Sequence, residues 1–285
     1  MNTACHLDTI LHPQASLVLR DASLLGAWES AHQRIELYHS PLFGHFYCLD
    51  GALMSTEADE FYCHENLVHP AALALPLLQR ALVIGGGDGG SARQLLKYAS
   101  LQALQLAELD PAVVDMARRH LPGIHQGAFD DPRLSLHFGD GRDYLLQSRE
   151  AFQLIVLDLT DPVGPAAPLY CADFFAACRQ RLGTGGVLSL HLGSPVYQPA
   201  QVQRIYRELR KVFAVVRPAL VPIPSYGGLW ALALASDASD PASLDPTEIK
   251  KRLTGRGIAG LNYYNGATHQ AMFALPEFLR AALPD

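Results

Sequence analysis

The amino-acid sequence predicts an α/β protein with a mostly parallel β-sheet, preceded by a small antiparallel β-domain. From about residue 56 onward, short apolar segments alternate with helix-like segments, which is typical of parallel strands joined by helical crossovers. Before that point the pattern alternates residue by residue and is rich in β-forming side chains. A chain of 285 residues with 49% hydrophobic side chains is long enough for one large domain and a small one. We therefore divide it into residues 1–55 and 56–285.

The first segment contains two recognisable strands. Residues 35–38 and 45–49 have β-forming sequences, and Ser40-Pro41 lies between them. Asp50-Gly51 after the second strand is a turn signal. These features predict an antiparallel layer.

The second segment alternates strands and helices to its end. Predicted strands are residues 81–84, 104–107, 134–138, 152–157, 187–192, a segment near 215, and 229–235. Predicted helices are residues 57–74, 91–98, 111–120, 172–182, 200–213, 246–253 and 276–283. Two of these helices begin with an N-cap followed by a first-turn proline, at Asp110-Pro111 and Asp245-Pro246. The glycines Gly185-Gly186 are expected to end the helix predicted over residues 172–182.

Composition excludes several classes of function. The net charge is -6 and there is no basic run, which argues against a nucleic-acid partner. No apolar segment approaches the roughly 20 residues that span a bilayer, and residues 1–11 lack a signal pattern. Five cysteines without a C-x-x-C pair predict neither a disulfide framework nor a zinc site, and the histidine spacing predicts no metal site. We expect a protein of the reducing cytoplasm.

Acidic side chains follow four successive strands of the predicted sheet. Asp88 follows the first, Glu108 the second, Asp140 the third, and Asp158 with Asp161 the fourth. In an open parallel sheet, ligands bind outside the carboxyl ends of the strands. We therefore expect these carboxylates to line one site.

The glycine-rich loop at residues 85–90 follows the first strand of this sheet. Glycines such as Gly85 and Gly87 allow a tight turn and close approach of the backbone to a ligand. Such loops also arise for packing reasons alone. Asp88 sharpens the interpretation, because a carboxylate repels a pyrophosphate and attracts an ammonium or a sulfonium. The loop thus favours a ligand like S-adenosylmethionine over NAD, FAD or ATP.

The remaining acids each have a functional and a structural interpretation. Glu108 lies where an acid typically accepts the ribose hydroxyls, or it is a solvated acid at a strand end. Asp140, beside Gly141, either accepts an adenine amine or is a turn residue. Asp158 and Asp161 either hold a cation and accept a proton or form a turn with Pro162. For Asp110 we favour the helix cap.

Several segments occur in a characteristic order along the chain: residues 49–51, 59–61, 64–65, 85–90, 107–110, 130–133, 139–141, 158–165, 263–265 and 273–276. Over roughly residues 30 to 280 they resemble the spermidine synthase family of polyamine aminopropyltransferases. The resemblance implies a Rossmann-like sheet of the methyltransferase type and an N-terminal β-domain that helps form a homodimer or homotetramer. It also implies that decarboxylated S-adenosylmethionine is the aminopropyl donor, that a small-molecule diamine is the acceptor, and that no other cofactor or metal takes part.

The resemblance also implies roles for individual residues. On the donor side, Asp88 holds the aminopropyl amine, Glu108 the ribose and Asp140 the adenine amine, while the other donor-side positions are Gln33, Gly85, Gly87 and Gly141. On the acceptor side, Asp158 accepts the proton of the attacking amine and Asp161 anchors the diamine. His64, His191 and Tyr226 complete the acceptor side.

Five positions depart from the family pattern. Cys63 replaces a tyrosine, Met54 a glutamine, His191 a glutamine, Ser225 a tyrosine and Gly266 a proline. Most of them belong to the acceptor side, so we expect the reaction to be retained and the acceptor pocket altered. Cys63 is expected to be an ordinary small residue. His191 either changes the acceptor preference with pH, because an imidazole changes charge near pH 6.5, or only ends its strand in a polar cavity.

Two other functions stay open on the sequence alone. An S-adenosylmethionine-dependent amine N-methyltransferase would use the same nucleoside contacts, although its donor carries a carboxylate that Asp88 would repel. A non-catalytic polyamine- or thioadenosine-binding paralogue would explain the departures at Met54, Cys63 and Ser225. Retention of Asp158 and Asp161 argues against that paralogue.

Overall fold

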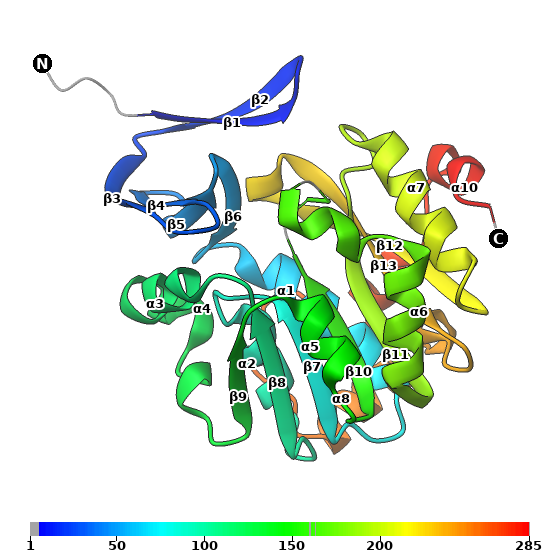
Figure 1. Cartoon of the computed structure of the whole chain (residues 1–285). Helices are drawn as coiled ribbons and strands as arrows, with labels where there is room; N and C mark the ends of the chain where they lie inside the picture. The colour runs from blue at the N-terminus through cyan, green and yellow to red at the C-terminus, as the bar shows by residue number, and fades with distance from the viewer. Residues whose placement is uncertain (1–5, 160, 163, 285) are drawn as a thin grey trace, which may run out of the picture.

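A computed structural model of the chain describes residues 6–159, 161–162 and 164–284 (Figure 1). Thr160 and Val163 of the segment 158–165 lie outside the described residues. The described chain forms a seven-stranded sheet, a four-stranded sheet and a two-stranded hairpin. The larger sheet is mostly parallel and the two smaller ones are antiparallel, so the predicted fold class is confirmed.

The N-terminal region holds the two small sheets. The hairpin consists of β1 (His6–His12) and β2 (Ala15–Arg20), and it stands out from the body at the top of Figure 1. The four-stranded sheet consists of β3 (Ser23–Glu29), β4 (Arg34–Ser40), β5 (Gly44–Leu49) and β6 (Ala52–Thr56) in that order. Strands β4 and β5 confirm the two predicted strands. The division at residue 55 stays a prediction, although β6 ends beside it.

The large sheet has the order β12-β13-β11-β10-β7-β8-β9. Its parallel strands are β7 (Arg80–Gly85), β8 (Ala103–Glu108), β9 (Leu134–Phe138), β10 (Phe152–Asp158) and β11 (Leu182–Gly193). The antiparallel edge consists of β12 (Val215–Ile223) and β13 (Gly228–Ser236). The strand order reverses between β7 and β10, which is where an open sheet of this kind opens a crevice for ligands.

Helices cover both faces of the large sheet. They are α1 (Glu60–Ala74), α2 (Gly90–Leu96), α3 (Pro111–His120), α4 (Pro122–His125), α5 (Gly141–Gln147), α6 (Ala172–Arg181), α7 (Pro199–Arg210), α8 (Pro246–Gly255), α9 (Gly266–Met272) and α10 (Glu277–Ala282). No helix in the described part of the chain has the length and apolar character to cross a membrane. Short 3₁₀ turns, including η3 (Pro224–Tyr226), connect several elements.

Successive side chains along the strands pack into two hydrophobic cores, one on each face of the large sheet. On β7, Val83 joins the core beneath α1 and α2, while Leu82 and Ile84 join the opposite core beneath α6 and α7. This alternation follows from the period of two along a strand. A third cluster joins Ile35 and Leu37 of β4 to α3. It fixes the small sheet next to the carboxyl ends of the large one.

Several element boundaries differ from the prediction. The first helix begins at Glu60, because residues 57–59 form a turn in which Thr56 bonds Asp59. Strand β11 begins at Leu182, so the glycines at 185 and 186 lie inside a strand and do not follow a helix end. The short helices α4, α5 and α9 were not predicted, because four to seven residues are too few to display helical periodicity.

Candidate active site

Helix α1 brings its first turns to the carboxyl ends of the central strands. The hydroxyl of Ser189, on β11, donates to the carbonyl of Leu67 on α1 over 2.6 Å. This contact and the core beneath α1 hold the helix across β11 and β10. Cys63 and His64, one turn earlier, therefore face the ends of the strands and meet residues from β7 and β10.

His64 is the centre of a buried cluster of charges. Its Nδ1 donates to Glu60 over 2.7 Å, and its Nε2 lies 3.6 Å from Asp88 and 3.9 Å from Asp158. Arg93 donates to both oxygens of Glu60, over 2.8 and 2.9 Å. The His64 side chain is only 3% exposed. The structure thus brings together Asp88, Asp158 and His64, which the sequence analysis assigned to one site.

Burial and charge set the protonation of this cluster. Burial lowers the pKa of His64, but the charge of Asp88 and the hydrogen bond to Glu60 outweigh it and raise the pKa to about 9. Burial and the charge of Asp158 raise the pKa of Asp88 above its ordinary value, although the charge of His64 opposes them. Burial alone would raise the pKa of Asp158, but contacts with His191 and His64 outweigh this effect, so the pKa is lowered. At neutral pH an imidazolium therefore faces an ionised Asp158.

The same three side chains form a candidate set of metal ligands. His64, Asp88 and Asp158 each offer one atom, and these atoms lie within 4.8 Å of one another. A metal takes the neutral imidazole, whereas His64, with a pKa of about 9, keeps its second proton at neutral pH. A metal at this position would have to displace that proton.

Asp158 offers an unoccupied acceptor to the site. Its Oδ2 is buried and has no hydrogen-bond partner among the described residues, while its Oδ1 lies 3.5 Å from Nε2 of His191. The side chain is 12% exposed. A buried carboxylate oxygen without a partner is costly unless a ligand supplies a donor. A hydrogen-bond donor of a bound ligand would satisfy this atom.

Asp161 lies farther along the same loop. It accepts hydrogen bonds from Gln198 over 2.6 Å and from Gln201 over 3.2 Å. These contacts connect the loop to α7, through Gln201, and to Gln198, the residue before that helix. The predicted role of Asp161 in anchoring a diamine therefore stays a prediction.

The donor side is built around the end of β8. Glu108 accepts from the backbone N–H of Asp110 over 2.9 Å, and burial raises the pKa of Glu108 to about 7. Asp110 caps α3, accepting from the N–H of Ala112 over 3.0 Å, as predicted. It also accepts from the Gln33 amide over 3.0 Å. Gln33, in the loop between β3 and β4, is thus held against Asp110, whose N–H bonds Glu108.

Asp140 and Gly141 form the start of α5. Asp140 caps the helix by accepting from the N–H of Arg142 over 2.7 Å, and it is exposed. A Cβ at Gly141 would lie 2.3 Å from a side-chain carbon of Ile84. The turn therefore has a structural reason for both residues, and adenine recognition by Asp140 stays a prediction.

The glycines at residues 85–90 make room for the acidic side chains. A Cβ at Gly85 would lie 2.2 Å from the carbonyl oxygen of Asp158, and its φ of +80° favours glycine. A Cβ at Gly87 would lie 2.9 Å from Oε2 of Glu108. The loop thus lets β7 approach β10 and β8 closely enough for their carboxylates to share one site.

The acceptor side explains several departures from the family pattern. Ser225 donates from its N–H and its hydroxyl to Asp59, over 2.8 and 3.0 Å. The hydroxyl of Tyr226 donates to the backbone carbonyl of Met54, so a backbone group holds this tyrosine. Burial raises the pKa of the Cys63 thiol well above its ordinary value, which agrees with an unreactive residue.

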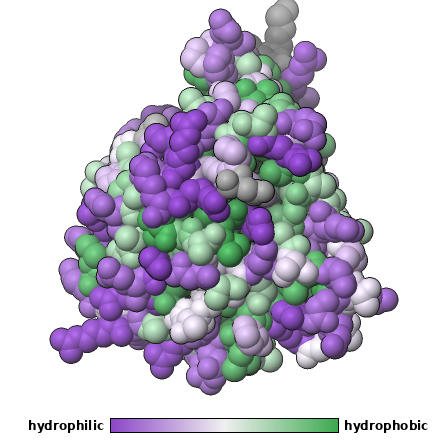
Figure 2. All heavy atoms as spheres, turned by 90° about the vertical axis from the view of Figure 1, so that its right-hand side faces the viewer, coloured by the Kyte–Doolittle hydropathy of each residue, from purple (hydrophilic) through white to green (hydrophobic). Residues whose placement is uncertain are grey.

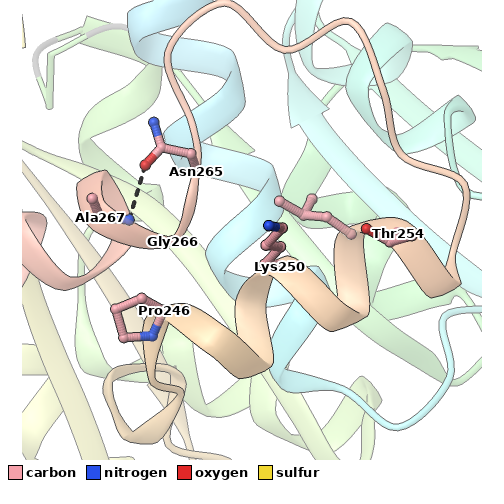
Figure 3. A pocket seen from close by; sticks show the side chains of 7 residues that line it. Pro246, Lys250, Thr254, Asn265, Gly266 and Ala267 are labelled. Carbon is pink, nitrogen blue, oxygen red and sulfur yellow. Dashed lines mark hydrogen bonds between the residues drawn. The ribbon is translucent and has the colours of Figure 1, made fainter.

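Gly266 has a packing explanation away from the acceptor side. A Cβ there would lie 2.5 Å from the carbonyl oxygen of Pro246, where α8 and α9 begin side by side. An open hollow of about 470 Å³ lies beside this contact. Figure 3 shows two of the residues that line it, Asn265 at the start of α9 and Lys250 on α8. None of the predicted site residues lines it.

No role was predicted from the sequence for Glu60, Arg93 or Trp230. Glu60 and His64 are spaced i and i+4 on one helix, so their contact was detectable once the helix had been placed. Arg93 and Trp230 come from α2 and β13. No local pattern predicts their contacts, because those depend on how distant elements pack.

Comparisons with known proteins found a matching family model and several similar relatives. The model of the spermine/spermidine synthase domain matches residues 60–243. A polyamine aminopropyltransferase of Nitrosomonas europaea is 50% identical over 275 residues, covering 96% of this chain and 85% of the relative. Polyamine aminopropyltransferase 1 of Pseudomonas aeruginosa is 36% identical over 262 residues, covering 92% of this chain and 91% of the relative.

Two solved structures are also similar over nearly the whole chain. A spermidine synthase in complex with the transition-state analogue AdoDATO has a TM-score of 0.92 at 33% identity, covering 99% of this chain and 96% of that chain. The spermidine synthase of Thermotoga maritima has a TM-score of 0.89 at 31% identity, covering 99% and 95%.

Proposed function

The chain belongs to the spermine/spermidine synthase family, and on that premise we propose that it transfers the aminopropyl group of decarboxylated S-adenosylmethionine to a diamine. The products are methylthioadenosine and the extended polyamine, which is spermidine when putrescine is the acceptor. The observation that carries the proposal is the buried Oδ2 of Asp158, which has no hydrogen-bond partner among the described residues and lies 3.9 Å from His64, beside Asp88. An anionic pocket of this kind suits a cationic donor and a cationic amine.

The reaction is an in-line displacement at carbon. The nitrogen lone pair of the acceptor forms a bond to the carbon next to the sulfonium, and the carbon–sulfur bond breaks with its electron pair passing to sulfur. The leaving group is a neutral thioether, so no acid has to protonate it. Positioning and charge complementarity supply the acceleration.

The acceptor needs one proton removed before it attacks. An alkylamine has a pKa of about 10 and arrives as an ammonium without a lone pair. Asp158, whose pKa is lowered, stays ionised and attracts this ammonium. Desolvation in the site lowers the pKa of the amine, and Oδ2 of Asp158 accepts its proton. Asp88 binds the donor's amine, Glu108 the ribose and Asp161 the far end of the diamine.

Product analysis tests this function. The protein is incubated with decarboxylated or intact S-adenosylmethionine and a panel of amines, and the products are identified by mass spectrometry. We expect methylthioadenosine and a gain of one aminopropyl group. A gain of one methyl group would identify an N-methyltransferase, and binding without turnover a non-catalytic paralogue. Either result would refute the proposal.

We also propose a homodimer or homotetramer located in the cytoplasm. Exposed large apolar side chains, including Leu25 and Trp28, occur on β1–β3 and support contact with a second copy. In contrast, Figure 2 shows hydrophilic side chains over much of the face near α7 and α10, with hydrophobic areas between them. The free thiols of Cys48, Cys63, Cys171 and Cys178 support a reducing compartment. Light scattering of the purified protein tests the assembly, and a monomeric mass would refute it.

A further inference from the structure

His191 ends the parallel part of the sheet beside the acceptor carboxylate. It lies on β11 and is buried. Its Nδ1 accepts a hydrogen bond from the indole N–H of Trp230 over 2.9 Å. Its Nε2 lies 3.5 Å from Oδ1 of Asp158 and 3.8 Å from Sγ of Cys63. The imidazole therefore bridges β13 and the reacting side of the site.

The Trp230 contact determines which protonation state of His191 fits. An indole N–H only donates, so Nδ1 must present its lone pair. A neutral imidazole with an unprotonated Nδ1 carries its proton on Nε2. A doubly protonated ring would place an N–H on Nδ1 against the indole N–H at 2.9 Å. The geometry thus favours the neutral ring, with its proton on the side of Asp158 and Cys63.

We propose that Trp230 and His191 are positioning residues for the acceptor amine. Trp230 holds His191 as the neutral tautomer protonated on Nε2, and His191 directs that proton to Oδ1 of Asp158. The other oxygen, Oδ2, is left for the amine. This inference rests on the proposed function for the identity of the amine, but the tautomer follows from the Trp230 contact alone.

Keeping His191 neutral matters because of what else surrounds Asp158. The titratable groups facing His191 are Asp158 from β10 and Cys63 from α1, and Tyr226 packs against Trp230 with ring centroids 4.9 Å apart. In the unliganded site the imidazolium of His64 lies 3.9 Å from Asp158. A second cation at His191 would leave little negative charge to attract the ammonium of the acceptor. This arrangement argues against the interpretation from the sequence in which His191 changes its charge, and with it the acceptor preference, with pH.

Replacing Trp230 with phenylalanine tests the proposal through a pH profile. The substitution keeps an aromatic ring and removes the indole N–H. The freed Nδ1 can then take up a proton at acidic pH. We expect kcat/KM for the acceptor, divided by the wild-type value at each pH, to be constant at alkaline pH. As the pH is lowered, this ratio should fall by up to about tenfold per pH unit.

The double variant Trp230→Phe, His191→Gln is the matched control. Glutamine cannot become a cation, so the additional acid limb should disappear and the ratio should become independent of pH. A constant ratio for Trp230→Phe from pH 5.5 to 8 would overturn the proposal. So would an acid limb that persists in the double variant, because its origin would then lie outside His191.

A spectroscopic measurement keeps the test valid if a variant fails to fold. In the wild-type protein labelled with ¹⁵N-histidine, the His191 signals are assigned by nuclear Overhauser contacts with the indole N–H of Trp230, which lies against Nδ1. From pH 5.5 to 8 we expect Nδ1 to be unprotonated and Nε2 to be protonated. A doubly protonated ring in this range would refute the inference. This result does not depend on turnover, whereas failure of the proposed function would appear in the product analysis.

Discussion

Binding of the cationic donor next to Asp88 is expected to displace the second proton of His64. The unliganded site pairs this imidazolium with Asp88 at 3.6 Å and with Asp158 at 3.9 Å, and its pKa is about 9. A donor ammonium that forms a hydrogen bond with Asp88 would lie about 5 Å from Nε2 of His64. Two cations at that distance repel each other, and the imidazole is the group that can lose its charge.

The size of the effect follows from the distance. At about 5 Å and an effective dielectric constant of about 20, two unit charges repel by about 3 kcal/mol, which corresponds to slightly more than two pKa units. The pKa of His64 should therefore fall from about 9 to just below 7 when the donor binds. At pH 7.5 the protonated fraction would decrease from more than nine-tenths to about one-fifth.

Nuclear magnetic resonance of ¹³C-labelled histidine measures this change directly. The His64 signal is identified by its absence in His64→Gln, and its titration midpoint is recorded without ligand and with decarboxylated S-adenosylmethionine. Methylthioadenosine is the matched control, because it fills the nucleoside site without an ammonium, and the midpoint should then stay near 9. A midpoint below 7 without ligand, or the same midpoint with and without donor, would refute the reasoning.

Three further predictions concern single side chains. Asp158→Asn should lower kcat by about 10²–10⁴-fold while the Kd of methylthioadenosine changes little; turnover at the wild-type rate would remove Asp158 from its role as the base. The pKa of Glu108 is raised from 4.5 to about 7, so the stability it contributes is full below pH 4.5 and lost as the pH rises through 7. In urea unfolding, the free energy of unfolding of the wild-type protein should therefore decrease by up to about 3 kcal/mol more than that of Glu108→Gln as the pH rises across this range. Equal pH dependence in both proteins would contradict this. Gly85→Ala should lower the free energy of unfolding by more than about 2 kcal/mol, because its Cβ would lie 2.2 Å from a backbone oxygen. Gly127→Ala, with a similar φ of +82° and no atom within 4 Å, is the control and should cost about 1 kcal/mol; equal losses would show that the contact with Asp158 is unimportant.

Local patterns predicted much of this protein from its sequence. Short apolar segments followed by Asp88, Glu108 and Asp158 placed acidic side chains at the ends of strands, and parallel strands bring those ends to one edge of a sheet. The Asp110-Pro111 pair likewise predicted the start of α3, because a cap acts within a few residues of itself. The antiparallel hairpin β1–β2 was not predicted as such. Its side chains alternate between buried and exposed, but Thr9 is buried and Ile10 is exposed, so the hydrophobic residues do not show this alternation in the sequence.

Only the tertiary structure decided how these carboxylates differ from one another. Asp88 and Asp158 have pKa shifts in opposite directions, because α1 places His64 against both of them and β11 places His191 against one. The role of Trp230 depends on the antiparallel pairing of β13 with β11, which no spacing in the sequence specifies. The sequence by itself determined which groups line the strand ends, whereas their charges depend on distances of 3 to 4 Å between distant segments, which only packing sets.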